Sequence, residues 1–267
     1  MFKKILVPLD GSVEAETVLP YVRDIAVRFD SEVDILSVGA GNRRRRVNHL
    51  LDDYIRHAVE HLEKHDVTCR SAVIYRDQQE EAISYTELTV PGRGLKTRGS
   101  VVYGGPADSI LAYTGKHHID LIIMATHGVG GLRRWWLGSV SEKIVAHSTT
   151  PILLIHSKQV KEIDRDRAVS FKRILAPLDG SDTGEAALHH AAEIAQKAGA
   201  FIILLHVIPE VHTVESRILG KEFDKFVKAM HDAGQQYLDK VKARLESRRS
   251  EERRVGKECR SRWSPYH

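Results

Sequence analysis

Four glycines lie between an apolar run and a helix-like segment, a composition suited to binding an anion. The apolar run, residues 121–123, indicates a buried parallel strand, and residues 139–145 have the pattern of a helix start. Glycine lets the backbone adopt positive φ and come close to a ligand. The N–H groups at a helix N-terminus favour phosphate through hydrogen bonds and through the helix dipole. A phosphate site is therefore predicted at the glycines, which are Gly128, Gly130, Gly131 and Gly138.

The spacing of the glycines distinguishes between phosphate-binding motifs. The sequence has no G-x-x-x-x-G-K-[ST], and Gly128 and Gly130 lack the third glycine of G-x-G-x-x-G, which argues against a P-loop and a dinucleotide fingerprint. The loop instead resembles the ATP-binding type of the universal stress protein family, whose motif is G-x-x-G-x9-G-[ST]. Here the motif stands as Ala125-x2-Gly128-x9-Gly138-Ser139, with a small alanine in place of the first glycine. The alternative is a tight loop that binds nothing, because glycines at turns also serve chain reversal alone.

The elements around this loop indicate an α/β domain. Residues 3–12 form a short apolar strand that ends in Asp10, residues 13–29 have apolar residues at helical spacing, and residues 33–38 form a second strand. A parallel β-α-β order places Asp10 at the carboxyl end of the first strand, where open α/β sheets bind ligands. The resemblance implies an open parallel five-stranded sheet in the order 3-2-1-4-5, flanked by helices, over residues 1–157.

The resemblance also implies roles for individual residues. Asp10 would contact the adenosine part of ATP, and Val38 would contact the adenine. The start of the helix at Gly138 would hold the phosphates, and ATP would bind with Mg. Taken alone, Asp10 also fits a turn or helix-capping carboxylate, and a strand valine such as Val38 is usually a core residue. The candidate ligand-binding residues are Pro8, Leu9, Asp10, Val38, Met124, Ala125, His127, Gly128, Gly131, Gly138, Ser139, Val140 and Ser141.

Two similar stretches, residues 67–76 and 95–104, make the third strand ambiguous. Only the later stretch runs into Gly105-Pro106, the strand-to-helix junction typical of the family's third strand. We therefore expect the third strand at 95–104 and an insertion or local duplication at about 48–79.

A histidine pattern lies inside this insertion. His57, Glu60 and His61 match H-x-x-E-H, a zinc-peptidase pattern, and His65 extends the same helix face. Catalytic zinc also needs a third ligand and an open cleft. Because the surrounding helix is charged on most sides, a solvated histidine face is favoured and no metal ligand is predicted, although such a face can capture a metal ion adventitiously.

The chain is a tandem with an incomplete second copy. Residues 171–181 repeat the first strand and its turn almost residue for residue, after a polar linker at 158–170. The second copy, residues 171–248, has the order β-α-β-α. It contains Asp179 and Val207, the counterparts of Asp10 and Val38, but no second glycine loop. A phosphate site is predicted in the first copy alone.

The last part of the chain differs in character from the rest. Residues 214–246 are predicted to form a long amphipathic helix. Residues 249–267 resemble the translation of a sequencing adapter and lack helical or strand periodicity, so they are interpreted as a non-native tail. They hold six Lys or Arg and three Asp or Glu, which is +3 of the formal net charge of +4. The remainder is near neutral, and no nucleic-acid function is expected.

Composition narrows the class of protein further. Hydrophobic residues make up 42% and charged residues 28% of the 267 residues, which is ordinary for a globular protein. Cys69 and Cys259 are far apart, so neither a disulfide framework nor a cysteine metal site is implied. No apolar run approaches the roughly 20 residues of a membrane-spanning helix, so no membrane association and a cytoplasmic location are expected.

The leading functional hypothesis is an ATP-binding stress or signalling protein that hydrolyses ATP slowly or not at all. No paired carboxylates or Ser-His-Asp order converge on the loop, so catalysis has no identified general base. The alternatives are an adenine-nucleotide-dependent enzyme of a related α/β group and an interaction module without nucleotide. The incomplete second copy is expected to expose a sheet edge, and so to dock on the first copy or to form homo-oligomers.

Overall fold

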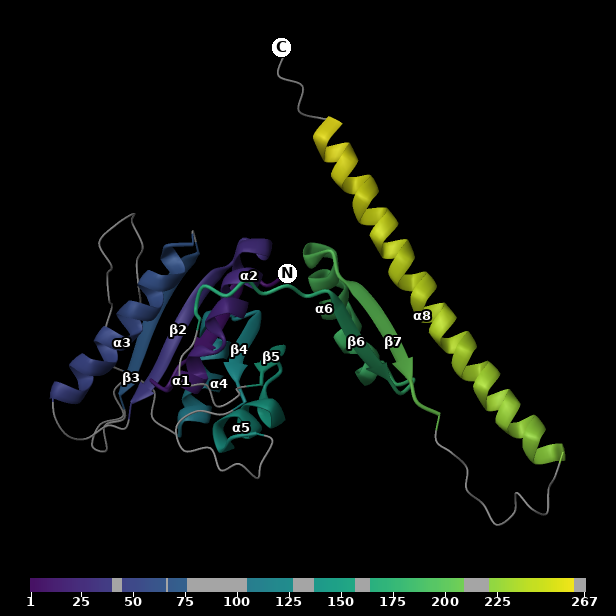
Figure 1. Cartoon of the computed structure of the whole chain (residues 1–267), viewed down its shortest axis with the longest axis horizontal. Helices are drawn as coiled ribbons and strands as arrows, with labels where there is room; N and C mark the ends of the chain where they lie inside the picture. The colour runs from purple at the N-terminus through teal and green to yellow at the C-terminus, as the bar shows by residue number, and fades with distance from the viewer. Residues whose placement is uncertain are drawn as a thin grey trace. The chain divides into compact units, whose positions relative to one another are not determined.

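The computed structural model describes residues 1–39, 45–65, 67–75, 105–126, 137–156, 164–208 and 221–261 (Figure 1). The chain divides into two compact units, Met1–Ser170 and Phe171–His267. Each unit contains a parallel sheet of its own.

Five parallel strands form the sheet of the first unit, in the order β3-β2-β1-β4-β5. This is the strand order that the sequence analysis expected. The central strand has Ile5, Leu6 and Val7 fully buried, as required of a strand that is covered on both faces. The strands are β1 (Lys4–Pro8), β2 (Glu32–Gly39), β3 (Thr68–Tyr75), β4 (Leu121–Ala125) and β5 (Ile152–Ile155).

Helices cover both faces of this sheet. The helices α4 (Pro106–His117) and α5 (Ser139–His147) pack on one face, where Leu6, Leu36, Ile122 and Met124 share a core cluster with Ile110 and Ile144. The helix α3 (Arg45–Glu63) contacts β2 and β3. Right-handed crossovers from β1 to β2 and from β2 to β3 place α3 and α2 (Leu19–Phe29) together on the opposite face.

The first crossover is broken near its start. A short helix, α1 (Val13–Glu16), precedes α2, and Pro20 lies in the first turn of α2. Proline is tolerated there because the first N–H groups of a helix have no partner within the helix. The predicted helix over 13–29 is therefore two helices, and Pro20 marks the start of the second.

The third strand corrects the sequence analysis. It is Thr68–Tyr75, which pairs with β2 along its whole length, so the interpretation of residues 48–79 as an insertion is wrong. The stretch 95–104, which was predicted to be this strand, lies outside the described residues. The packing of α3 explains why the earlier of the two similar stretches forms the third strand. The helix buries Ile55, Val59 and Leu62 and leads into β3 through a short connection.

The second unit has the predicted order β-α-β-α. Its two parallel strands are β6 (Arg173–Leu178) and β7 (Phe201–His206), and its helices are α6 (Asp182–Ala198) and α8 (Lys221–Ser261). A small core joins them, formed by Ala176, Leu178, Leu188 and Val241.

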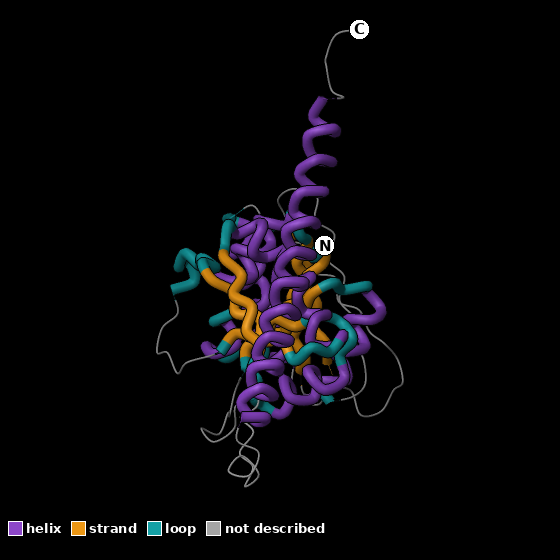
Figure 2. The backbone as a smooth tube through the Cα atoms, turned by 90° about the vertical axis from the view of Figure 1, so that its right-hand side faces the viewer, coloured by secondary structure: helices purple, strands orange, loops and turns teal. Residues whose placement is uncertain are grey.

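The helix α8 extends further than predicted. It is one continuous helix to Ser261 (Figures 1 and 2), whereas the sequence analysis ended the periodic helix at residue 246. Residues 249–261 lack an apolar period but are rich in Arg, Glu and Lys, which are good helix formers. Propensity therefore continues the helix where periodicity gives no signal.

The turn after the first strand is the same in both units. Ser12 Oγ donates to Asp10 Oδ1 at 2.6 Å and accepts from the Ala15 N–H at 3.0 Å. In the second copy, Ser181 Oγ donates to Asp179 Oδ1 at 2.7 Å. The intervening glycines both have φ of +86°, which favours glycine over other residues. The repeated sequence thus gives a repeated helix cap.

We predict that Ser12→Ala lowers the free energy of unfolding of the first unit by about 1 kcal/mol. The Ala15 N–H loses its acceptor and Asp10 loses a donor. Urea titration of the full chain measures the change. Ser12→Thr keeps the hydroxyl and is the control, so an equal loss in both variants would show that the cap is not the cause.

The second sheet has an unpaired edge, because β6 pairs with β7 alone among the described strands. Its uncovered face is apolar, with Leu175 58% and Phe201 76% exposed. Further exposed residues of this unit are Ile203, Leu205 and Val207. Such edges and faces invite association with another chain.

A chain that ends at Ser170 is therefore expected to be more soluble than the full chain and to stay monomeric at concentrations where the full chain associates. Light scattering after size-exclusion chromatography compares the two. Loss of the cooperative melt in the shortened chain would instead show that the second unit is an integral part of the first unit's core.

Candidate functional site

The ends of β1 and β4 lie side by side in the first sheet. Ile5 pairs with Leu121 and Leu6 with Ile122, so the two strands run in register toward the same edge. The chain turns from β1 toward β2 on one side and from β4 toward β5 on the other. This edge is therefore a topological switch point, where open α/β sheets bind ligands.

The start of α5 is held against the end of β4. The Gly138 N–H donates to the Thr126 carbonyl at 2.8 Å. The Ser141 hydroxyl lies 2.9 Å from the carbonyls of both Thr126 and Gly138 and donates to them. Ser141 is buried, and these bonds satisfy its hydroxyl. Ser141 thus fixes the start of α5, so its hydroxyl has a structural role in addition to the phosphate contact that the resemblance implies.

The N-terminus of α5 has no side-chain cap within the described part of the chain. Gly138 is the N-cap residue, with φ −73° and ψ 158° and no side chain to accept a hydrogen bond. The first N–H groups of a helix need an acceptor from outside it. Those of Ser139, Val140 and Ser141 stand at the helix start, which the Gly138 N–H joins to Thr126. This geometry suits an anion.

Asp10 lies just after β1, the strand that neighbours β4 in the sheet. Its Oδ1 accepts from the Ser12 N–H at 3.0 Å and from the Ser12 hydroxyl at 2.6 Å. The turn role that the sequence left open is therefore present, and the carboxylate remains exposed at the sheet edge. Leu9 is buried, and its N–H donates to the Leu36 carbonyl at 2.9 Å, which fixes the backbone beside Pro8.

The apolar candidates line the inner side of this edge. Met124 and Ala125 are buried, and Met124 belongs to the core cluster under α4 and α5. Val38 and Val140 are partly buried against the same cluster. His127, Gly128 and Gly131 lie outside the described residues. The structure thus gathers candidates from β1, β4 and α5 at one edge, with Val38 near the end of the adjacent strand β2.

Several residues near this edge gave no signal in the sequence. Glu16 is buried and forms an ion pair with Arg165, whose Nε lies 2.8 Å from Oε2. Burial raises the pKa of Tyr54 above its usual range, and the carboxylates of Glu16 and Asp10 add to the effect. Tyr54 is therefore a neutral phenol at neutral pH and is not poised to act as a base. Thr126 supplies the carbonyl that holds α5, and its position directly after β4 could have indicated this role.

Cys69 is not a nucleophile for this site. It lies on β3 opposite Val33 and is buried. Burial raises the pKa of its thiol above the usual range, so the reactive thiolate does not form at neutral pH. Cys69 therefore does not support the enzyme alternative.

The histidine pattern separates in the structure. His57 Nδ1 lies 2.7 Å from the Asp53 carbonyl, one turn earlier on α3. His61 and His65 instead face Asp166, and donor atoms of these three residues lie within 4.8 Å of one another. The pair that the pattern shares with zinc peptidases, His57 and His61, is therefore not the pair that the fold brings together.

An open parallel sheet with an uncapped helix N-terminus at its switch point defines an α/β protein with a candidate anion site. The profile of the universal stress protein family matches residues 1–156 and 170–261. The chain belongs to the universal stress protein family. The two matched regions correspond to the two copies.

Curated relatives align with a little over half of the chain. Universal stress protein MJ0531 of Methanocaldococcus jannaschii is 26% identical over 155 residues, which is 58% of this chain and 82% of the relative. Universal stress protein YxiE of Bacillus subtilis is 28% identical over 158 residues, 58% of this chain and 99% of the relative.

Solved structures cover more of the chain. A universal stress protein from Archaeoglobus fulgidus has a TM-score of 0.51 at 19% identity and covers 86% of this chain and 75% of its own. A protein of unknown function from Pseudomonas aeruginosa PAO1 has a TM-score of 0.58 at 15% identity and covers 92% of this chain and 70% of its own. At these identities the likeness concerns the fold. Across the described residues, none of the helices combines the length and apolar character that a bilayer crossing requires.

We predict that Ser141→Ala lowers the free energy of unfolding of the first unit by about 1 kcal/mol, because the carbonyls of Thr126 and Gly138 lose a buried donor. Urea titration measures the loss. Ser139→Ala, two residues earlier and exposed, is the matched control and should change stability little. Equal effects of the two changes would rule out a structural role for the Ser141 hydroxyl.

Proposed function

We propose that the first unit binds ATP, with Mg, at the switch point between β1 and β4, and that the protein acts as a nucleotide-binding stress or signalling protein. The observation that carries the proposal is the uncapped N-terminus of α5, which starts at Gly138 beside the end of β4. Anionic phosphates are the natural acceptors for such N–H groups. Membership of the universal stress protein family supports the nucleotide as their source.

The candidate residues divide between the two ends of the nucleotide. The N–H groups of Ser139, Val140 and Ser141 bind the phosphates, and Gly138 keeps this side free of a competing side chain. Met124 and Ala125 lie under the ribose and phosphates, together with His127, Gly128 and Gly131 of the motif loop. Asp10 and Val38 contact the adenosine, beside Pro8 and Leu9.

The described residues around this edge favour binding over turnover. Asp10 is engaged by the turn, Ser141 by two carbonyls, and Tyr54 stays protonated. A general base needs a pKa near the working pH and access to the attacking water. Because all three groups are committed in these ways, we expect hydrolysis to be slow at most. The proposed ATP site is that of the first unit, which contains Gly138.

Gly138→Asp tests the phosphate site. The new carboxylate would take the place of the phosphate at the first N–H groups, and ATP affinity is expected to fall by about 1.5–3 kcal/mol, roughly 10- to 100-fold. Aspartate is also a good N-cap residue, so the melting temperature should stay the same or rise. Calorimetric titration with Mg-ATP and a thermal melt of the same sample separate lost binding from lost folding.

Gly105→Asp is the matched control. Gly105 is the N-cap of α4 in the same unit, with φ −65° and ψ 162° and no side-chain cap, so the same change is made at an equivalent helical position. ATP should bind this variant as it binds the natural chain. Unchanged affinity in Gly138→Asp would remove the assignment of the phosphate site. Absence of ATP binding by the natural chain would favour the interaction module without nucleotide.

A further inference from the structure

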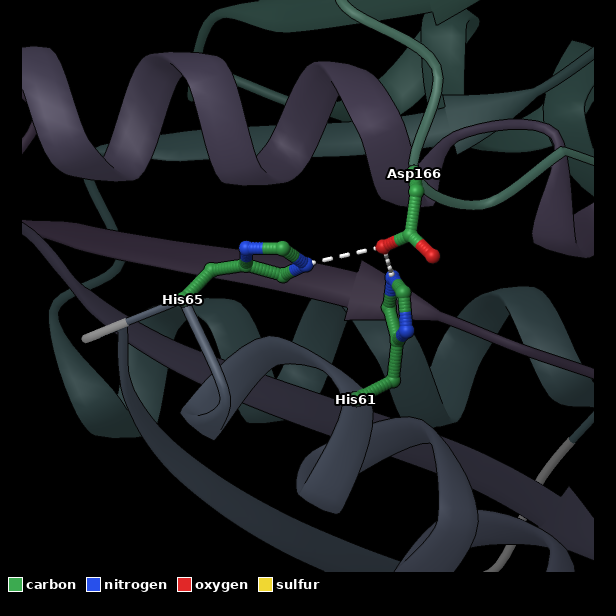
Figure 3. Close-up of side chains that lie close together, drawn as sticks. All are labelled: His61, His65 and Asp166. Atoms are coloured by element: carbon green, nitrogen blue, oxygen red, sulfur yellow. Dashed lines mark hydrogen bonds and ion pairs between the residues drawn. The ribbon is translucent and has the colours of Figure 1, made fainter.

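Two segments that are distant in sequence meet at the end of α3. One is the last turn of α3 with the turn that follows it, which carries His61 and His65. The other is residues 164–167, which come after β5 and belong to the first unit. Figure 3 shows both imidazole rings directed at the carboxylate of Asp166. The two segments are about 100 residues apart in the chain, so this contact is a product of the fold.

The three side chains have donor atoms spaced for a transition metal. His65 Nε2 lies 2.9 Å and His61 Nε2 lies 4.0 Å from Asp166 Oδ1. Zinc–nitrogen and zinc–oxygen bonds of about 2.1 Å place tetrahedral ligand atoms about 3.4 Å apart. The His65–Asp166 separation is about half an ångström shorter than this, and the His61–Asp166 separation is about half an ångström longer. Rotation of the side chains supplies these differences. The two rings meet edge to face, with centroids 5.4 Å apart, and both approach Asp166 (Figure 3).

The group is open to solvent, and one contact of His61 has to be exchanged for the metal. His61 Nε2 lies 3.3 Å from the Arg165 carbonyl, so the ring turns from this carbonyl when Nε2 binds an ion. Asp166 is 73% exposed, so an ion reaches the group from solvent and a water completes its coordination.

The backbone of Asp166 is held in place before any ion binds. Arg23 on α2 donates through Nη2 to the carbonyls of Asp166 at 3.1 Å and Arg167 at 2.9 Å. Arg165 pairs with the buried Glu16. The Arg23 guanidinium also lies 3.3 Å from His65 Nε2, and its charge opposes a second cation. When a metal binds, Arg23 Nη1 must move away from His65 while Nη2 keeps its contacts with the two carbonyls.

We propose that His61, His65 and Asp166 bind one Zn²⁺, which fastens the segment 164–167 to α3. Two imidazoles and a carboxylate are ligands that zinc accepts, and three protein ligands plus water is a known zinc coordination. The ion joins the end of the first copy to α3, the helix of the crossover from β2 to β3. The site is separate from the proposed nucleotide site and needs neither Asp10 nor Gly138.

Zinc titration of the full chain tests this site. The chain is first stripped with a chelator, and Zn²⁺ is added in competition with a chromophoric chelator. One equivalent should bind and raise the melting temperature of the first unit. In His65→Gln and Asp166→Asn the affinity for Zn²⁺ should fall by roughly tenfold or more, and Zn²⁺ should no longer raise the melting temperature. Cobalt in place of zinc should give the visible spectrum of a tetrahedral site in the natural chain and in neither of these two variants.

His57→Gln is the matched control, since it removes an α3 histidine that faces the Asp53 carbonyl instead of Asp166. Its zinc affinity should equal that of the natural chain. Melts recorded with chelator present establish that each variant is folded. If both His65→Gln and Asp166→Asn still bound one Zn²⁺ as tightly as the natural chain, the proposal would be overturned. Loss of this Zn²⁺ binding in His57→Gln would also overturn it and would assign the metal to the helical H-x-x-E-H pattern.

Discussion

The hydrogen bonds between the end of β4 and the start of α5 are the constraint on which the candidate nucleotide site depends. The helices α1 and α6 begin with serine caps, Ser12 and Ser181, whose hydroxyls accept from their own first-turn N–H groups. At α5 the N-cap is Gly138, and the serine of the first turn, Ser141, is turned back to hold carbonyls. A side-chain cap contributes about 1 kcal/mol to a helix. The fold forgoes that stabilisation at α5, as it does at α4 with its N-cap Gly105. The uncapped start of α5 lies beside the end of β4, and this is consistent with a ligand that supplies the missing acceptor.

The sequence predicts most of this edge because its signals are local. An apolar run such as 121–123 and a Gly-Ser pair before a helix need only neighbouring residues to be recognised. The third strand could not be predicted in the same way. Residues 67–76 and 95–104 have nearly the same strand pattern, and the choice between them depends on how the apolar face of α3 packs on β2 and β3. The segment around Asp166 is polar and aperiodic, and its partners Glu16, Arg23 and His65 lie about 100 to 150 residues away in sequence.

The composition of the strand β7 in the second unit does not match its burial. In β7 the residues alternate between exposed and half-buried, although every residue from Phe201 to Leu205 is apolar. A continuous apolar run is the pattern of a parallel strand covered on both faces. In the described part of this unit, the core cluster lies on one face only, with α6 and α8. The composition of β7 is therefore that of a strand covered on both faces, whereas helices cover one face of this sheet, and the other face is an apolar surface.

The segment 164–167 links the chemistry of the first unit to its packing. Arg165 compensates the buried charge of Glu16, and loss of one partner of such a pair leaves an uncompensated charge that is strongly destabilising. That requirement, together with the carbonyl contacts of Arg23, fixes the backbone on either side of Asp166. A metal ion at His61 and His65 then has to order only side chains, which lowers the entropic cost of binding. A partly buried ion pair beside the first helix thus preorganises the proposed metal site, which no linear motif describes.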